Sequence, residues 1–110
     1  MSDVTLAIAN PKAGVQTLID NKTQLPIDGV VFSNQSVGVN SNSDAADFTF
    51  DGTNFIGTGK AAGSGTVVLS AHVVGIDPGD GSTIDEDKSV TKNFTVLPSA
   101  DGTTFDVVFP

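Results

Sequence analysis

Four Asp-Gly pairs punctuate this chain at intervals of 21 to 29 residues and are its strongest signal for turns between β-strands. They stand at residues 28–29, 51–52, 80–81 and 101–102. Asp-Gly between alternating apolar residues favours a tight hairpin turn, because both residues tolerate positive φ. The clearest case is Phe48–Phe50, followed by Asp51-Gly52 and then Phe55-Ile56. The sequence therefore predicts antiparallel hairpins.

About nine short strands follow from this pattern, the number expected of a β-sandwich. Besides the hairpin, we expect strands near Val4–Ala9, Val15–Ile19, Val30–Ser33, Val37–Asn40, Thr66–Gly75, Ser89–Leu97 and Thr103–Phe109. A short helix over Ala13–Asp20 is the alternative for the second strand. We expect surface loops at Asn34–Asp44 and Ile76–Asp87. The length of 110 residues predicts a single all-β domain over residues 1–110.

The segment Phe55–Ala71, FIGTGKAAGSGTVVLSA, gives the most detail. Its glycines suit positive-φ turns and close backbone approach, and they would destabilise a helix. Val67, Leu69 and Ala71 alternate after the turn and predict the core face of a strand. His72 has the opposite parity and should point away from the core.

This run resembles the group 2 bacterial immunoglobulin-like domains, in which a strand leads through a Lys-Ala-Ala-Gly-like turn into a Thr-rich strand. Gly59–Gly63 supplies the turn here, and Gly65–Ala71 supplies the strand. The resemblance covers about Asp44 to Val96 and implies an immunoglobulin-like β-sandwich of about seven to nine strands. It also implies that Phe48 or Phe50 fills the aromatic core position. Such modules occur in virion accessory or decoration proteins of bacteriophages and in bacterial surface proteins.

Charge excludes two classes of partner. Asp and Glu number 13 against 5 basic residues, which gives a net charge of −8. A nucleic-acid surface needs Lys and Arg to replace condensed counterions, and an anionic membrane repels the same sign of charge. The chain has no cysteine, so disulfides and thiolate chemistry are absent as well.

The acidic segment Ile76–Asp87 is the one candidate for a cofactor site. Asp77, Asp80, Asp85 and Asp87, with Glu86 beside them, offer the hard oxygen ligands that Ca²⁺ prefers. The spacing does not fit an EF-hand, because glycine follows Asp77 at the third and fifth positions of such a loop. We therefore expect solvated turn residues and no cofactor, with calcium as the alternative.

No catalytic constellation emerges. Ser70 and His72 share a strand face, but side chains two residues apart on a strand lie ~6.5–7 Å apart, too far for a nucleophile–base hydrogen bond. A paired-carboxylate hydrolase lacks the Trp or Tyr that would stack on a sugar. We expect that the chain is not an enzyme.

The terminal strand is the candidate interface. Phe105, Val107 and Phe109 share one parity, while Val108 lies on the other, and Asp106 is the only charge in Thr103–Phe109. Sheet edges must be paired, covered or charged. We expect this strand to contact another protein subunit, either a second copy or a coat or tail protein.

These observations predict a non-enzymatic structural and interaction protein. A bacteriophage capsid decoration or tail protein fits best, located in the virion and assembled in the host cytoplasm, since Met1–Lys12 has no secretory pattern. An adhesive or glycan-binding repeat of a bacterial surface protein, located at the cell surface, is the alternative.

Overall fold

A computed structural model describes residues 3–8, 10–11, 14 and 16–109. The described residues form nine β-strands and no helix, so none of them belongs to a helix long and apolar enough to cross a membrane. The strands are β1 (Val4–Ile8), β2 (Gln16–Asp20), β3 (Leu25–Pro26), β4 (Val31–Asn40), β5 (Ala46–Phe50), β6 (Phe55–Gly59), β7 (Gly63–Ile76), β8 (Thr83–Pro98) and β9 (Phe105–Val108). The all-β prediction is confirmed.

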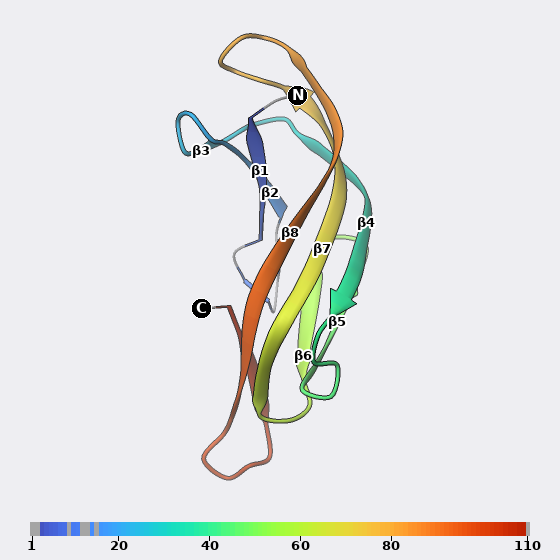
Figure 1. Cartoon of the computed structure of the whole chain (residues 1–110), viewed down its shortest axis with the longest axis vertical. Coiled ribbons are helices and arrows are strands. Elements are labelled where there is room, and N and C mark those ends of the chain that lie inside the picture. The colour runs from blue at the N-terminus through green and yellow to red at the C-terminus, as the bar shows by residue number, and fades with distance from the viewer. Residues whose placement is uncertain (1–2, 9, 12–13, 15, 110) are drawn as a thin grey trace.

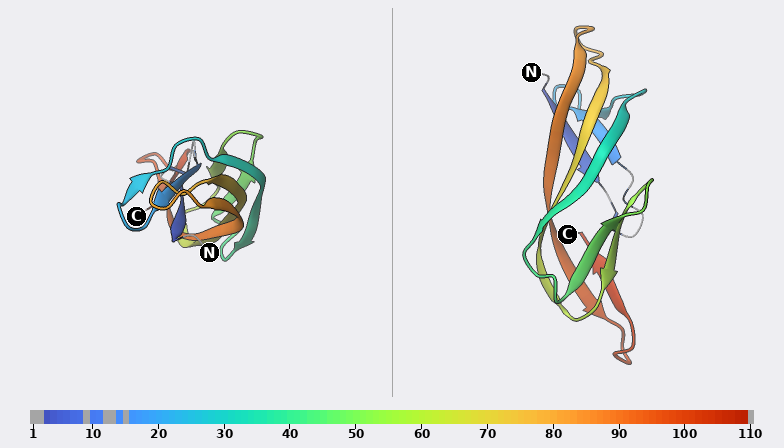
Figure 2. Two further views of the ribbon diagram at one scale, coloured as in Figure 1. Left: turned by 90° about the horizontal axis from the view of Figure 1, so that it is seen from above. Right: turned by 90° about the vertical axis from the view of Figure 1, so that its right-hand side faces the viewer.

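The strands form two layers. One layer is a four-stranded antiparallel sheet in the order β4-β7-β8-β9. The other contains the sheet β1-β2-β3 and the hairpin β5-β6, joined by an isolated antiparallel bridge between Gly14 and Phe55. Apolar side chains from both layers meet in the interior. The result is a β-sandwich, whose layers are visible in Figure 2.

The sandwich is long and narrow, with extents of 53 × 24 × 20 Å. The hairpin of β7 and β8 runs along most of its length (Figure 1). Two hydrophobic clusters lie one beyond the other beneath this hairpin. The larger includes Phe48, Phe55 and Phe94, and the smaller includes Val4, Leu18 and Ile84.

The core prediction for β7 is confirmed. Val67, Leu69 and Ala71 are buried, and His72 points to the outer face of the sheet. Phe48 and Phe94 meet edge to face in the larger cluster, with ring centres 5.0 Å apart. Phe48 is buried and Phe50 is partly buried, and both pack in this cluster.

Two predicted loops are shorter than expected, since the connections occupy residues 41–45 and 77–82, and one alternative is wrong. β8 begins at Thr83, so Asp85, Glu86 and Asp87 are strand residues paired with β7, and the connection is confined to residues 77–82. Residues 34–40 belong to β4, which joins the two strands expected separately. Polar sequence misled both interpretations, because a sheet with one solvent-facing side accepts Asp, Ser and Asn there. The helical alternative also fails, since β2 occupies Gln16–Asp20.

The Asp-Gly turns form, but only their glycines have positive φ, whereas the sequence predicted positive φ at both residues. Gly29, Gly52, Gly81 and Gly102 have φ between 72° and 101°, whereas no Asp has positive φ. In the turns of Asp51, Asp80 and Asp101 the carboxylate instead accepts backbone N–H groups, as Asp51 does from Thr53 and Asn54 at 2.8 and 2.7 Å. Three of the pairs close hairpins, and Asp28-Gly29 precedes β4 instead.

The glycine-rich turn between β6 and β7 also forms as expected. A Cβ at Gly59 would lie 2.6 Å from the carbonyl oxygen of Phe105, which is closer than atoms approach. Glycine is therefore required where the end of β6 crosses β9.

Candidate functional site

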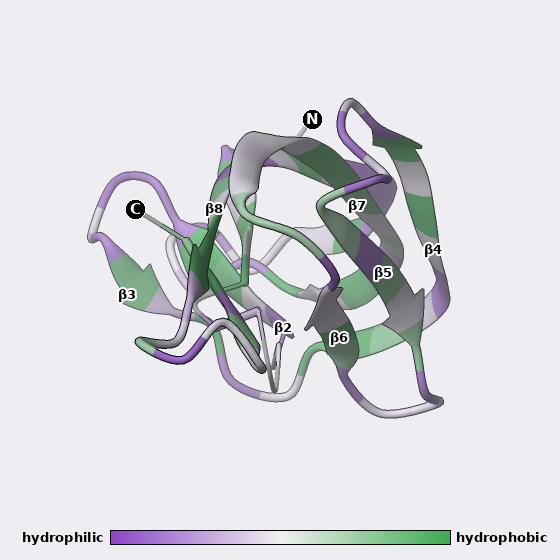
Figure 3. Ribbon diagram, turned by 90° about the horizontal axis from the view of Figure 1, so that it is seen from below, coloured by the Kyte–Doolittle hydropathy of each residue, from purple (hydrophilic) through white to green (hydrophobic). Residues whose placement is uncertain are grey.

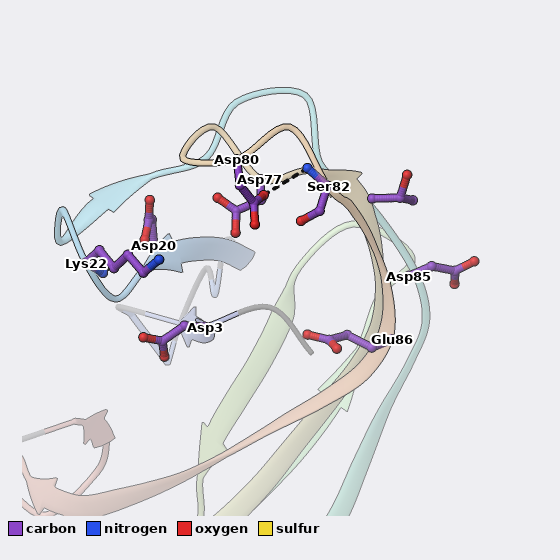
Figure 4. A pocket seen from close by; sticks show the side chains of 9 residues that line it. Asp3, Asp20, Lys22, Asp77, Asp80, Ser82, Asp85 and Glu86 are labelled. Atoms are coloured by element: carbon purple, nitrogen blue, oxygen red, sulfur yellow. Dashed lines mark hydrogen bonds between the residues drawn. The ribbon is translucent and has the colours of Figure 1, made fainter.

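The acidic end of the sandwich contains an open pocket of about 620 Å³. It lies between the β7–β8 connection, the start of β1 and the turn after β2 (Figure 4). The residues that line it are Asp3, Asp20, Lys22, Asp77, Asp80, Ser82, Thr83, Asp85 and Glu86.

The carboxylates of Asp77 and Asp80 accept hydrogen bonds within the turn that contains them. The Asp77 carboxylate accepts the Gly79 N–H at 2.8 Å, and that of Asp80 accepts the Ser82 N–H at 2.9 Å. Hydrogen bonds from the Ser82 side chain and backbone lower the pKa of Asp80, and Lys22 acts in the same direction. Local turn stabilisation thus accounts for both carboxylates.

Asp85 and Asp87 form hydrogen bonds with His72 on the outer face of the sheet. Asp85 Oδ1 lies 2.6 Å from His72 Nε2, and Asp87 Oδ1 lies 2.7 Å from His72 Nδ1. Carboxylates only accept hydrogen bonds, so both contacts require an imidazolium with two N–H donors. The hydrogen bonds from Asp87 and then Asp85 raise the pKa of His72. These side chains brace β7 against β8.

The four calcium candidates are therefore divided between two tasks. Asp77 and Asp80 stabilise the turn, while Asp85 and Asp87 hold His72. Among the described residues, no group of three or more His, Asp or Glu side chains is arranged to hold a metal ion. The sequence placed these carboxylates in one loop, and the hairpin register separates them.

Of two further acids at this end, Asp20 is buried and Glu86 is partly buried. Asp20 is 3% exposed and accepts the Lys22 N–H at 2.9 Å. Glu86 faces inward and pairs with Lys88, with Oε1 and Nζ 3.4 Å apart. Both acids line the pocket, and Glu86 Oε1 makes this ion pair but accepts no hydrogen bond from a described residue.

The terminal strand is part of the sandwich. β9 pairs with Thr95–Pro98 of β8, and Val107 is 2% exposed in the larger cluster. Phe109 stacks on Phe48, with ring centres 6.3 Å apart, and the Lys92 ammonium lies 5.2 Å from its ring centre. Phe105 and Phe109 remain partly exposed. The predicted contact with another subunit through Phe105, Val107 and Phe109 stays a prediction. Of these side chains, the Phe105 and Phe109 rings are accessible to such a partner.

An exposed apolar patch elsewhere was missed at the sequence level. Val31 of β4 pairs with Val74 of β7, and Ile76 follows two residues later on the same face. The three side chains are 61%, 39% and 56% exposed. We call this set the outer patch. Its signal was present in the sequence, because Val74 and Ile76 share the parity of His72, which was expected to face outward.

Comparison with known proteins adds no relative. No protein-family model matches the chain, and neither a curated protein nor a solved structure does so.

Proposed function

We propose that this chain is a non-enzymatic immunoglobulin-like module that acts as a structural and interaction protein on a bacteriophage capsid or tail. The observation that carries the proposal is the use of its acidic side chains. Six acids line the open pocket, but Asp80 caps its own turn, Asp85 contacts His72 and Glu86 pairs with Lys88, and no described group of three or more is arranged to hold a metal ion. Function then resides in surfaces and edges.

The strand order supports the immunoglobulin-like assignment. With the Gly14–Phe55 bridge, one layer has the order β1-β2-β6-β5, and the other contains β4-β7-β8. These orders correspond to strands A-B-E-D and C-F-G of the constant-type immunoglobulin arrangement. β3 and β9 are additions, the latter following the strand equivalent to G.

The shape supports a structural role. A narrow sandwich with three capped Asp-Gly hairpin turns presents rigid loops and edges at low cost in conformational entropy. A net charge of −8 keeps unassembled copies apart, so that assembly depends on a partner surface.

Particle association tests the proposal. The tagged full chain should be produced during phage propagation, and particles should be banded on a density gradient. We expect the chain to band with particles at a fixed ratio to the coat protein. Recovery with free proteins would contradict the virion proposal, and recovery with the cell envelope would favour the bacterial surface alternative.

A further inference from the structure

The four Asp-Gly pairs differ in the contacts of their reactive atoms. In an Asp-Gly sequence the backbone nitrogen of glycine can attack the side-chain carboxyl carbon of the preceding Asp, and glycine hinders this attack least because it has no Cβ. The attack requires the carboxyl to turn toward that nitrogen and the intervening peptide to rotate. Hydrogen bonds that hold either group in place therefore oppose the reaction.

Hydrogen bonds of this kind hold the second and third pairs. The Asp51 carboxylate accepts two backbone N–H groups, at 2.8 and 2.7 Å. The Asp80 carboxylate accepts one at 2.9 Å, and the Gly81 N–H donates to the carbonyl oxygen of Asp77 at 2.8 Å. Rotation of either peptide toward its carboxyl would break some of these bonds.

The fourth pair is held most firmly. The Asp101 carboxylate accepts the Ser99 hydroxyl at 2.6 Å, and the Thr103 hydroxyl and N–H at 2.7 and 3.1 Å. The Gly102 N–H donates to the Ser99 carbonyl oxygen at 3.0 Å. Hydrogen bonds from the Ser99 and Thr103 side chains also lower the pKa of Asp101, so the neutral carboxyl, which is the form that can release water, is rare.

The first pair, Asp28-Gly29, has no such contacts. Neither residue makes a hydrogen bond in the part of the chain that the structure describes, and Asp28 makes no ion pair there. Both residues are exposed, in the connection from β3 to β4, which runs along the outside of the molecule from one side to the other (Figure 3). Rotation of the peptide between Asp28 and Gly29 therefore breaks no hydrogen bond.

We propose that Asp28-Gly29 is a site of spontaneous covalent modification, at which Asp28 converts to isoaspartate in the folded protein. The Gly29 nitrogen forms a bond to Cγ of Asp28 and loses its proton, while the neutral carboxyl loses its hydroxyl group. One water leaves, and a succinimide ring remains. Water then opens the ring by breaking the bond between the Asp28 main-chain carbonyl carbon and the Gly29 nitrogen. The main chain afterwards runs through Cγ, and the former carbonyl becomes a carboxylate.

The new linkage lengthens the main chain within a connection that is fixed at both ends. Ile27 is buried in the smaller cluster, and its N–H donates to the Leu18 carbonyl oxygen at 2.8 Å. Val30 packs against the same cluster, and only Asp28 and Gly29 separate it from Ile27. One extra methylene in this connection should displace Ile27 or Val30. We therefore expect the modified chain to be less stable.

Ageing of the full chain, followed site by site, tests the proposal. The folded protein and the same protein in denaturant should be incubated at mildly acidic pH, digested and mapped by electron-transfer fragmentation, which distinguishes isoaspartate from aspartate. In denaturant the four pairs should convert at similar rates, because they share the Asp-Gly sequence. In the folded chain we expect conversion at Asp28 to be at least about tenfold faster than at the other three, since each hydrogen bond that must break slows the step by about fivefold.

Two variants serve as matched controls. Asp28→Glu keeps the charge but would have to close a larger ring, so position 28 should not convert. Its melting temperature should stay constant during the incubation, while that of the parent chain falls. Ser99→Ala removes one hydrogen bond to Asp101 and should raise conversion there by about fivefold, with the rate at Asp28 unchanged.

Equal conversion at the four sites of the folded chain, or faster conversion at Asp51, Asp80 or Asp101, would overturn the proposal. So would a folded chain that keeps Asp28 intact while the denatured chain converts it. An unchanged melting temperature after conversion would refute the displacement of Ile27 or Val30. None of these outcomes depends on particle association, so this site and the proposed function can fail separately.

Discussion

The two halves of the sandwich interior contain different kinds of buried side chain. The half beneath β5, β6 and β9 contains three buried phenylalanines, with three more packed around them. The acidic half beneath β1 and β2 contains five buried aliphatic side chains, with Phe32 packed against them. Aromatic rings bury more area each than aliphatic side chains. The aromatic half should therefore unfold last.

The boundary between the halves is marked on β8. Its inward residues run from Ile84 through Glu86 and Lys88 to Val90 and Phe94. Across the pair, Lys88 lies opposite Ala71 and Glu86 opposite Val73. A partly buried ion pair thus stands where a continuous core would place apolar side chains.

A matched pair of Leu→Ala variants gives the largest expected effect. Leu69 and Leu18 are both fully buried, one in each half. We expect Leu69→Ala to lower the free energy of unfolding by about 3–5 kcal/mol and Leu18→Ala by about 2–3 kcal/mol, since the smaller cluster can collapse around its cavity. Denaturant unfolding measures both. Equal losses, or a larger loss for Leu18→Ala, would remove the distinction between the halves.

Joining the halves should have a smaller effect on stability and a visible effect on solubility. Glu86→Met with Lys88→Met replaces the ion pair by apolar side chains. We expect stability to stay the same or rise by about 1 kcal/mol, because buried ion pairs contribute little beyond their desolvation cost. The doubly substituted chain should also aggregate at high concentration, since β8 loses its inward charges. Thermal melting and light scattering test both results. A soluble, destabilised variant would contradict the idea that the charges of Glu86 and Lys88 protect the β8 edge from pairing with another chain.

Acid should weaken the hairpin turn of the aromatic half. Hydrogen bonds from the Ser99 and Thr103 side chains lower the pKa of Asp101 to about 2. The ionised Asp101 carboxylate therefore stabilises the folded state at pH values above 3.8, the ordinary pKa of Asp. That stabilisation is lost as the pH falls toward 2. We expect Asp101→Asn to lower the melting temperature at pH 6 and to leave it almost unchanged at pH 2. An equal loss at both values would mean that ionisation of Asp101 is irrelevant.

The acidic half should respond in the opposite direction through His72. Its pKa is raised above 6.5 by Asp87 and Asp85, so the bracing is present below 6.5 and is lost as pH rises through the folded-state pKa. His72 is partly exposed and both aspartates are exposed to solvent, so we expect a small effect. NMR titration should place the His72 transition above 6.5, and Asp87→Asn should lower it. An unshifted transition in the parent chain would contradict the bracing.

The sequence by itself determined the all-β class, the turns and the orientation of β7. Asp-Gly pairs and the alternation of Val67, Leu69 and Ala71 suffice for these features, because turn chemistry and strand parity are local. Phe105, Val107 and Phe109 were likewise predicted to share a face, and all three pack on the larger cluster.

Only the tertiary structure decided which side chains meet. The register of β7 with β8 places Asp85 and Asp87 around His72, although Asp77 and Asp80 lie nearer to His72 in the sequence. It also leaves β4 as an uncharged margin beside Val74, a feature that no local pattern encodes. Pairing register depends on the whole sheet, since a shift by one residue would exchange its two faces.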